Sequence, residues 1–598
     1  MTLKFYYGWF VALLITFILI GHYNITHNSL TSDEPAYLGA AYAYTQGVGL
    51  NPEHPPILKL LNSLLFWLKF PQLQVDLPDL NALDTNGSRA IRLAAFNVGY
   101  QLLMYFPDTF NSLVPLSRWL YLGVNSLLLI WLGLYSFAFK LLHPQIALIF
   151  ATLWILSPSF ASHQGLIAFD TAVAVTALMT ILTTAIALYS LTQLQGKYLI
   201  GQFLILTVSL SLAINTKLSN LLLLPILMIS FGITSVYLAK QKSTLTRPFI
   251  TLSFGSLLVQ PLVIGIMYRI AFAQEIDQSL GAIGQRYLNT LTLTLEAARG
   301  QQVPFLWGAF QPVNYGQYIS KVFWYKENPI LFLLMGIIFW ALFLYTKTQK
   351  ANHPGLTLRA FLQAKLASKP FLLLTAFSVL IAAYPLLYFG LAKGSRFVIG
   401  YRYFYPVLLF SYFLLTILLV SLKNYYPKKW LITGLLIYSL AGAIAVPQTL
   451  SYVNPFWFGD KWLLVDDSTL NWGQENRAVV NYLLENQLLP KYNQNILIHR
   501  TFNVAININQ YLELLTQQRG YPLDSQSYYQ QAVFEPLQNP IAQLPHRYLL
   551  IDSTVKQTLY AERHQSSIAA QNWQYLQEHQ PIYSHNGIMF LYQLHPSS

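Results

Sequence analysis

Cysteine is absent from this chain of 598 residues, and charged side chains are scarce. Without cysteine the protein can form no disulfide, no thiolate nucleophile and no cysteine-ligated metal site. Asp, Glu, Lys and Arg make up 10% of the residues, against about 25% in a typical soluble domain. Hydrophobic residues reach 54%, and the mean hydropathy is +0.41. This composition predicts an α-helical polytopic membrane protein.

Long apolar runs fill much of the chain up to about residue 447. A membrane-spanning helix needs about 20 mostly apolar residues, and eleven stretches approach that length. The first stretch lacks a small-residue cleavage site, so it is interpreted as an anchor and not as a removed signal peptide. The predicted spans are residues 6–22, 116–138, 144–161, 171–190, 199–214, 219–238, 248–271, 329–346, 370–390, 403–422 and 430–447.

Acidic residues are missing from every second loop between these spans. If the N-terminus is cytoplasmic, the inner loops hold lysine and arginine but no Asp or Glu, as the positive-inside rule favours. This predicts a multi-pass protein of the inner (plasma) membrane with a periplasmic or otherwise extracytoplasmic C-terminal region. Because these loops hold much of the net charge of +13, no nucleic-acid partner is expected. The inner cations are Lys4, Lys140, Lys197, Lys240, Lys242, Arg247, Lys347, Lys350, Arg359, Lys365, Lys369, Lys423, Lys428 and Lys429.

Three substantial segments would then share the outer face. Two are loops within a predicted transmembrane domain of residues 1–447, at about 23–115 and about 272–328. The third is residues 448–598, which are polar, rich in Gln and Asn, and contain the strand-like runs "NILIHR" and "HRYLLIDS". We therefore expect a soluble α/β domain after residue 447.

A carboxylate pair stands just after the first span, in "SDEPAYLGAAYAYTQGVGLNPEHPP". Acids near hydrocarbon are costly and usually face a polar cavity, where a raised pKa makes them better bases. Asp33 and Glu34 are therefore candidate catalytic residues. The alternative is an ordinary solvated acid at the start of a helix capped by Ser32. Asp170, at the outer end of the fourth span, has the same two interpretations.

Cations gather in a short outer loop, "LAKGSRFVIGYR", which contains no acid. The positive-inside rule disfavours Lys393, Arg396 and Arg402 on that side, so an anionic ligand is expected to offset them. The ligand is either a phosphate group or anionic lipid head groups. Lys217, at another outer boundary, is a further candidate or only extends its ammonium to the interface.

The remaining polar residues of the first outer loop give weaker signals. Glu53 and His54 lie together, but no second histidine stands at metal-ligand spacing, so a loop histidine is favoured over a metal site. Pro55 and Pro56 stiffen the loop. There is no phosphate-binding GxxxxGK[ST] motif and no GxGxxG after a strand, so nucleotide-driven chemistry has no support. No cofactor and no metal is predicted.

The order of several motifs resembles the membrane glycosyltransferases of the GT-C superfamily, among them protein O-mannosyltransferases and the lipid A aminoarabinose transferase. The similar stretches are "NPEHPPILK" after the acidic pair, "SPSFASHQGLIAFDT" with His163 and Asp170, "INTKLSNLLLLP" with Lys217, "VIGYRYFYPVLLF" with Arg402, and "LVDDSTLNWGQENRAVVNYL". Two departures concern acceptor contacts: the family's aromatic Lys-Thr-Pro stretch is reduced to "KVFWYKENP" with Lys326, and Asn471 and Glu475 stand where Asp is usual.

The resemblance implies an enzyme that moves one sugar from a polyprenyl-phosphate carrier to an acceptor hydroxyl, with inversion. The acceptor would be a protein, a lipid or a glycan, and membrane lipids would surround the enzyme. It implies Asp33 as the base, with Glu34 and Asp170 beside it. Arg402, Lys217, Arg396 and Lys393 would bind the donor phosphate, and His54, Glu53, Lys59 and Lys326 would line the substrate loop. A transporter or flippase of lipid-linked sugars and a non-catalytic envelope scaffold are the alternatives.

Overall fold

The computed structural model describes most of the chain. Its described residues are 3–51, 53–78, 88–104, 107–193, 199–274, 279–352, 369–465, 467–486, 488, 496–499 and 539–595. The inner-loop residues Lys197, Arg359 and Lys365 lie outside them.

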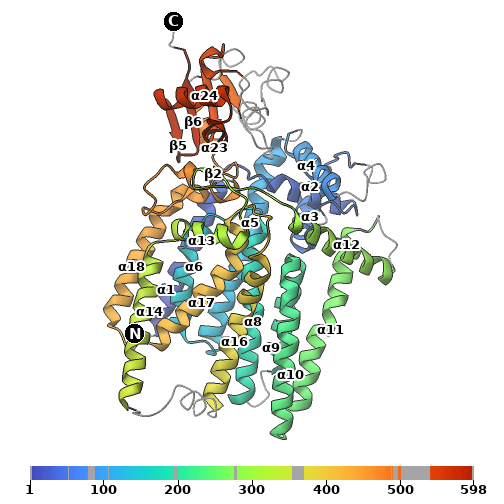
Figure 1. The fold of residues 1–598 in the computed structure, drawn as a ribbon. Helices are drawn as coiled ribbons and strands as arrows, with labels where there is room; N and C mark the ends of the chain where they lie inside the picture. Colours follow the sequence, from blue (N-terminus) through green and yellow to red (C-terminus); the bar gives the residue numbers. More distant parts are fainter. Residues whose placement is uncertain are drawn as a thin grey trace.

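A bundle of long apolar helices forms the lower part of the molecule (Figure 1). Within the described residues, nine helical stretches are long and apolar enough to cross a membrane, which makes this an integral multi-pass membrane protein. The other two predicted spans coincide with shorter apolar stretches, in α6 (Pro144–Ile155) and in the 380–392 part of α16 (Lys369–Ala392). The long helices are α1 (Leu3–His27), α5 (Pro107–Gly133, continued by η1, Leu134–Ala138), α8 (Phe169–Gln193), α9 (Leu199–Thr216), α10 (Leu223–Lys240), α11 (Thr246–Ala271), α14 (Ile330–Asn352), α17 (Tyr405–Ser421) and α18 (Lys428–Ala445).

Helix α8 is the centre of the bundle. It packs against α5, α9, α16 and α17. In its most apolar stretch of 18 residues 94% is buried, compared with 22% in α1 at the edge of the bundle. Three of its polar side chains form their hydrogen bonds within the helix, since the hydroxyls of Thr176, Thr180 and Thr184 each donate to the carbonyl oxygen four residues earlier. The first turn of α8 therefore has a fixed position under the outer segments.

The segment predicted to be the first outer loop folds into three helices that cover one end of the bundle (Figure 1): α2 (Glu34–Thr45), α3 (Ile57–Lys69) and α4 (Ser88–Met104). Helices α2 and α4 cross in close contact because each has a glycine at the crossing. A Cβ on Gly39 would lie 2.1 Å from the Ala95 carbonyl oxygen, and one on Gly99 would lie 2.0 Å from the Pro35 carbonyl oxygen. The crossing holds the start of α2 in place.

The second outer loop lies at the same end of the bundle. It contains α12 (Leu280–Arg299), the two short strands β1 (Phe305–Leu306) and β2 (Ala309–Phe310), and α13 (Tyr315–Lys326). Trp307 and Gly308 join the strands with positive φ values of 54° and 82°, which suits a tight hairpin turn. Asn314 and Gln317 form a reciprocal capping box that begins α13.

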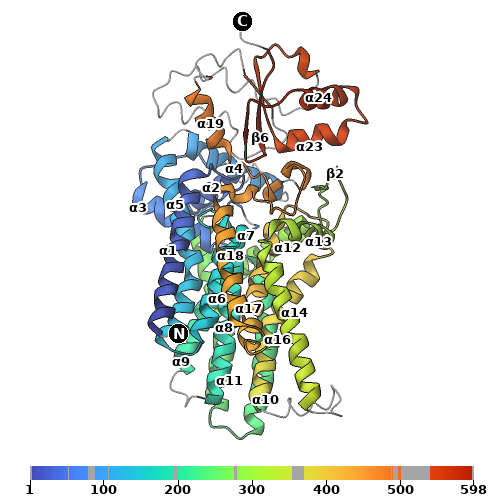
Figure 2. The ribbon, with the colours of Figure 1, turned by 90° about the vertical axis from the view of Figure 1, so that its left-hand side faces the viewer.

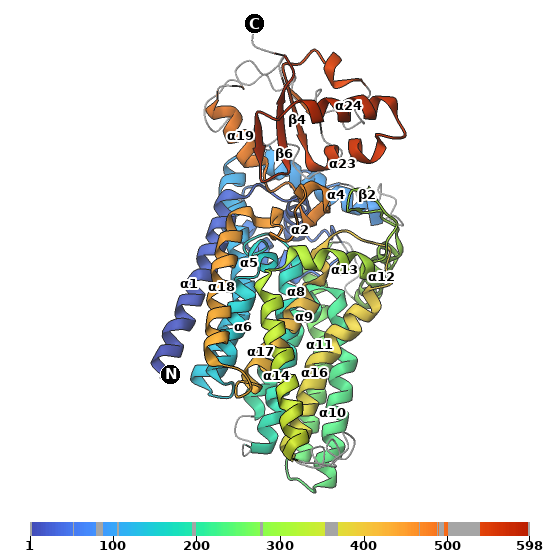
Figure 3. The same ribbon diagram turned by 60° about the vertical axis from the view of Figure 1, so that its left-hand side comes forward.

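The C-terminal region forms a separate layer beyond these loops (Figure 2, Figure 3). Its four-stranded sheet has the order β3-β4-β6-β5, with β3 and β4 parallel and the other pairs antiparallel. The predicted strand runs contain β3 and β4, which confirms the α/β character of this region. Its elements are η4 (Val446–Ser451), η5 (Lys461–Leu463), η6 (Asp467–Thr469), α19 (Asn476–Glu485), β3 (Ile496–His499), η7 (Ile541–Gln543), β4 (Tyr548–Asp552), α23 (Ser553–Glu562), α24 (Ser567–Glu578), β5 (Tyr583–His585) and β6 (Met589–Gln593).

Part of this layer forms an apolar cluster of its own. Trp462, Leu549, Ile551 and Phe590 are among its buried side chains. Other side chains of the same sheet, Leu550 and Leu591, belong to the large apolar core that includes the bundle helices, so the C-terminal layer is packed against the bundle.

Candidate functional site

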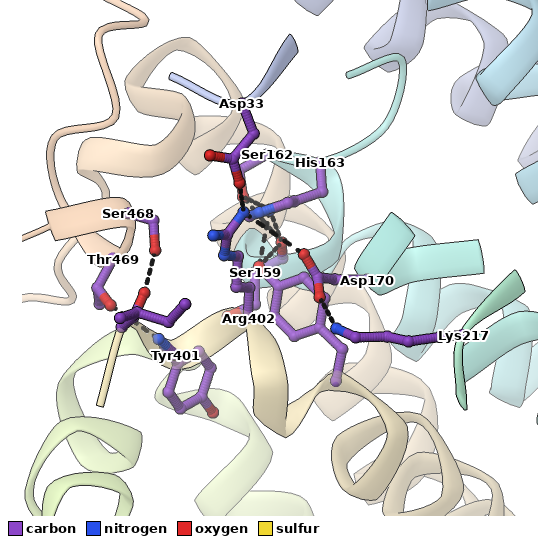
Figure 4. Close-up of polar contacts among 12 residues, drawn as sticks. Asp33, Ser159, Ser162, His163, Asp170, Lys217, Tyr401, Arg402, Ser468 and Thr469 are labelled. Carbon is purple, nitrogen blue, oxygen red and sulfur yellow. Dashed lines mark hydrogen bonds and ion pairs between the residues drawn. The ribbon is translucent and has the colours of Figure 1, made fainter. Parts of the chain in front are cut away.

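Four charged side chains form a continuous chain of ion pairs at the outer end of the bundle (Figure 4). Arg402 Nη1 lies 2.9 Å from Asp33 Oδ2 and 3.7 Å from Asp170 Oδ2. Lys217 Nζ lies 2.9 Å from Asp170 Oδ1. Arg402 and Asp170 are buried, whereas the Asp33 side chain is 26% exposed. The two acids and two bases neutralise each other, which makes their burial tolerable.

Asp33 has the backbone position of a helix cap but does not use its side chain as one. It precedes α2 as the N-cap residue, and in the described chain its carboxylate makes no capping hydrogen bond. The carboxylate accepts from Arg402 instead. Of the two interpretations of Asp33, the structure thus favours a partnered group facing a site over a solvated cap.

Arg402 is placed by a glycine and a short 3₁₀ turn. The turn η3 (Tyr401–Phe404) leads directly into α17. Gly400 precedes it with φ of 129°, and a Cβ there would lie 2.2 Å from Ser468 Oγ, so only glycine fits. Arg402 Nη1 is used by the two acids, while Nε is buried and has no hydrogen-bond partner among the described residues. Because Arg402 also lines the cavity, the positive charge of its guanidinium is available to a ligand there.

Asp170 and Lys217 come from neighbouring helices of the bundle. Asp170 lies in the first turn of α8, where a negative charge also suits the helix dipole. Lys217 stands between α9 and η2 (Leu218–Leu222), and its Nζ lies 4.2 Å from the centre of the Tyr403 ring. It is thus held by a carboxylate and an aromatic face, and does not simply extend into the interface.

A cavity of about 790 Å³ opens beside this chain of ion pairs. Its wall combines a polar end with an apolar flank contributed by η2, α10, α12 and α16. The polar end holds Asp33, Asn51, Glu53, His54, Lys217, Arg402 and Tyr403. The flank holds Leu221, Leu222, Pro225, Leu291, Leu295 and Leu391. Such a wall can receive a molecule with a charged head and a hydrocarbon part.

The "NPEHPP" loop forms one edge of the cavity through Asn51, Glu53 and His54. Lys59 holds this loop in place. Lys59 is buried and donates to the carbonyl oxygens of Asn51 (2.6 Å) and His54 (2.9 Å). Burial lowers the pKa of Lys59 to about 7. Burial, with the nearby Lys217 and Lys59, also lowers the pKa of His54 well below its ordinary value. The imidazole, whose ring centre lies 4.8 Å from that of Phe169, is therefore neutral at neutral pH.

Glu34 does not join the chain of ion pairs. Its carboxylate is fully buried and accepts two hydrogen bonds from Arg118, at 2.9 and 2.7 Å. It also accepts from the backbone N–H groups of Thr31 (2.7 Å) and Ile167 (3.0 Å). The predicted pair thus divides: Asp33 faces the cavity, and Glu34 ties α2 to α5 and to the segment before α8.

Three other predicted cations also lie apart from the chain of ion pairs. Lys326 is buried and donates to the carbonyl oxygens of Leu450 and Tyr452, both at 2.7 Å. Lys393 and Arg396 are exposed, and neither is among the described residues that line the cavity. Of the three cations predicted in this loop, Arg402 alone is among the described residues that line the cavity.

A hydroxyl network lies behind Arg402. The Tyr405 hydroxyl lies 2.8 Å from His163 Nδ1 and donates to the Ser159 carbonyl. The buried carboxylate of Glu327 accepts from Tyr401, Tyr412, Ser157 and Ser159. Burial raises the pKa of Glu327 above its ordinary value.

Sequence reasoning missed several of these groups. An arginine within a predicted span demands a buried partner, so Arg118 could have been found and paired with an acid. Tyr403 and Glu327 carry no comparable signal. Among the described residues, no three His, Asp or Glu side chains gather closely enough to hold a metal ion.

Comparison with solved structures finds similar architecture at low identity. The chain covers 98% of ArnT from Cupriavidus metallidurans bound to undecaprenyl phosphate, with 99% of this chain aligned, 12% identity and a TM-score of 0.42. It covers 72% of the Archaeoglobus fulgidus oligosaccharyltransferase tethered with an acceptor peptide, with 96% of this chain aligned, 10% identity and a TM-score of 0.39. These neighbours are GT-C glycosyltransferases. No family model matches the chain, and no curated protein matches it closely enough to show a relationship. The function is therefore argued from the site.

Proposed function

We propose that this chain is a membrane glycosyltransferase that moves one sugar from a polyprenyl-phosphate carrier to an acceptor hydroxyl on the outer face of the membrane. The observation that carries the proposal is the Asp33–Arg402–Asp170–Lys217 chain of ion pairs at the polar end of a cavity with an apolar flank. This site combines a proton acceptor, fixed cations and an apolar surface that can contact a hydrocarbon chain.

The cavity suits a lipid phosphate better than a nucleotide sugar. Arg402 and Lys217 both line the cavity, so they place two positive charges where a phosphate group would bind. The apolar flank, with Leu222, Pro225 and Leu391, offers a path for a prenyl chain towards the bilayer. Neither feature would help to bind a nucleoside.

The reaction is a single displacement at the anomeric carbon. The acceptor oxygen forms a bond to that carbon while the bond to the phosphate oxygen breaks, and the electron pair leaves on the phosphate. Asp33 takes the acceptor's proton, and the cations stabilise the charge that develops on the leaving phosphate. Because the phosphate is already a good leaving group, no general acid is required. One displacement inverts the configuration.

Asp170 has a positioning role in this scheme. It lies between the two cations, 2.9 Å from Lys217 Nζ and 3.7 Å from Arg402 Nη1. Without its charge, the buried Arg402 and the partly buried Lys217 would repel each other. Asp170 therefore keeps both cations directed at one phosphate.

A transporter of lipid-linked sugars remains the competing function. Transporter sites usually lie near the bilayer midplane, at broken helices. All four charged groups stand instead at the ends of helices, beside segments that would be polar loops. This arrangement supports chemistry at the interface. In the proposed topology the N-terminus is cytoplasmic, and the region from 448 to 598 is a domain on the outer face that shares the site's side of the membrane.

The test uses the full-length protein in liposomes with synthetic polyprenyl-phosphate sugars and a membrane extract as the source of acceptors. Release of free polyprenyl phosphate and transfer of labelled sugar are both measured. Asp33→Asn should lower transfer about 10²- to 10⁴-fold, with donor binding retained. Glu296→Gln, an exposed acid on α12, is the control and should act like wild type. Normal turnover of Asp33→Asn, or lipid translocation without transfer, would overturn the proposal.

A further inference from the structure

The segment Ser468–Gln474 belongs to the C-terminal region by sequence, yet it contacts the backbone on both sides of the Asp33–Arg402 ion pair. On the Asp33 side, the Ser32 N–H donates to the Trp472 carbonyl at 3.0 Å. The Ser29 N–H donates to the Gln474 carbonyl at 2.9 Å. The residue directly before Asp33 is therefore held by this segment.

The same segment holds the residue directly before Arg402 (Figure 4). The Tyr401 N–H donates to Thr469 Oγ1 at 2.8 Å, and Ser468 Oγ donates to the Ile399 carbonyl at 2.6 Å. Gly400 lies between these two contacts, and its missing side chain lets Ser468 approach. Two hydrogen bonds thus fix the short turn that carries Arg402.

The Trp472 ring completes the contact. It is buried, and its centre lies 4.1 Å from Arg402 Cζ, within the range of a cation–π interaction. It packs with Leu166 and Leu450 in a small apolar cluster. The ring therefore fixes one face of the guanidinium while Asp33 and Asp170 fix Nη1.

The segment is itself rigid, so it can transmit this order. Gln474 Oε1 accepts from the Trp472 N–H at 2.7 Å, and Gln474 Nε2 donates to the Leu470 carbonyl at 3.0 Å. Gly473 supplies the positive φ of 89° that the turn needs. The backbone and the ring of Trp472 therefore move as one unit.

We propose that Ser468–Gln474 is a structural part of the active centre and that Thr469 and Trp472 are positioning residues for Arg402 and Asp33. They act through these two residues and do not touch the substrate. The inference rests on the proposed function, because the chemistry it assists is that transfer. It gives the C-terminal region a direct part in the reaction.

The test compares variants in the liposome transfer assay, with rates corrected for folded protein. Trp472→Leu keeps apolar volume but removes the ring, and it should lower kcat about 10- to 30-fold. KM for the donor should rise less. Trp472→Phe keeps a ring face and should recover most of the rate. Thr469→Val should lower kcat, whereas Thr469→Ser keeps the acceptor oxygen and should not.

Trp462→Leu is the matched control. Trp462 is equally buried in the C-terminal core, and its contacts there do not include Arg402. It should lower the melting temperature without changing kcat. Equal kcat losses in Trp462→Leu and Trp472→Leu would overturn the inference, as would normal kcat in Trp472→Leu. If Trp472→Leu fails to fold, the difference between Thr469→Val and Thr469→Ser decides the question, and equal rates in that pair overturn it. Loss of transfer in Asp33→Asn together with normal kcat in Trp472→Leu would contradict only this inference.

Discussion

Arg402 Nη1 lies 2.9 Å from Asp33 Oδ2, although the two residues are 369 positions apart in the chain. Asp33 begins a helix of the first outer loop, and Arg402 lies in the turn before a bundle helix. The ion pair therefore exists only while the outer loop is docked on the bundle. Since both residues line the cavity, docking of the loop and assembly of the site are one event.

The geometry of the Arg402 guanidinium should matter more than its charge. Arg402→Lys keeps a positive charge but replaces a planar group that reaches both acids with a single ammonium. We expect kcat/KM for the lipid donor to fall about 100-fold, since a lysine ammonium cannot reproduce both the contact of the planar guanidinium with the Trp472 ring and the position of Nη1 between the two acids. Arg396→Lys, in the same loop but exposed, is the control. Similar losses in both variants would show that the loop's total charge, and not Arg402, governs donor binding.

Glu34 should prove to be a stability residue. Glu34→Gln leaves the buried Arg118 cation without its counter-charge, and breaking such a pair costs about 3–5 kcal/mol. The expected result is a large fall in melting temperature, with near-normal transfer by the protein that remains folded. Combining Glu34→Gln with Arg118→Met should restore part of the stability. A well-folded but inactive Glu34→Gln protein would contradict this prediction and indicate that Glu34 takes part in the reaction.

The helices could be predicted from sequence because burial in a bilayer imposes a length. A run of apolar residues that is long enough to cross hydrocarbon must form a helix, since its backbone groups have no other partners. All eleven predicted spans coincide with helices, although α6 has only 12 residues. Short apolar runs bounded by polar residues likewise identified the stretches containing β3 and β4.

The site could be predicted only in part. Adjacent residues point about 100° apart on a helix, so the sequence could not say which of Asp33 and Glu34 faces a cavity. The register of α2, fixed by its crossing with α4 at Gly39, makes that choice. The stretch "LVDDSTLNWGQENRAVVNYL" resembled a family motif, but the sequence alone did not indicate what it would contact. Only the folded structure shows that this segment returns to the end of the bundle, where Trp472 lies against Arg402.

Lys59 should give the protein a pH-dependent stability. Burial lowers its pKa to about 7 from an ordinary value of 10.5. The folded protein then binds fewer protons than the unfolded chain between these values, so stability rises with pH across that window. The melting temperature of the wild type should therefore increase from pH 7 to pH 10 more than that of Lys59→Met. The variant leaves two carbonyls without their donor, so the slopes are compared and not the absolute values. Lys69→Met, exposed on the same helix, should keep the wild-type slope.

Glu327 should stabilise the turn that carries Arg402 through a cage of hydroxyl groups. Its Oε1 accepts from Ser159 at 2.6 Å and from Tyr401 at 2.9 Å, and its Oε2 accepts from Tyr412 at 2.6 Å. Tyr401 directly precedes Arg402, so this cage and the Thr469 hydroxyl hold the same residue from two sides.

Glu327→Gln replaces one acceptor oxygen by an NH₂ group, which faces hydroxyl donors. The expected cost is about 1–3 kcal/mol of stability, the penalty for a buried polar group that loses its partner. Because burial raises the pKa of Glu327, the folded state favours the protonated acid. The wild type should therefore lose stability as pH rises from the ordinary value of 4.5 through the raised pKa. The amide cannot titrate, so Glu327→Gln should lack this decline, while Glu578→Gln, exposed on α24, should keep it. Thermal melting of the three proteins in detergent between pH 4.5 and pH 8 measures both effects. If wild type and Glu327→Gln melt in parallel over that range, the carboxyl group does not titrate there, and its contribution to holding Tyr401 must be that of hydrogen bonds alone.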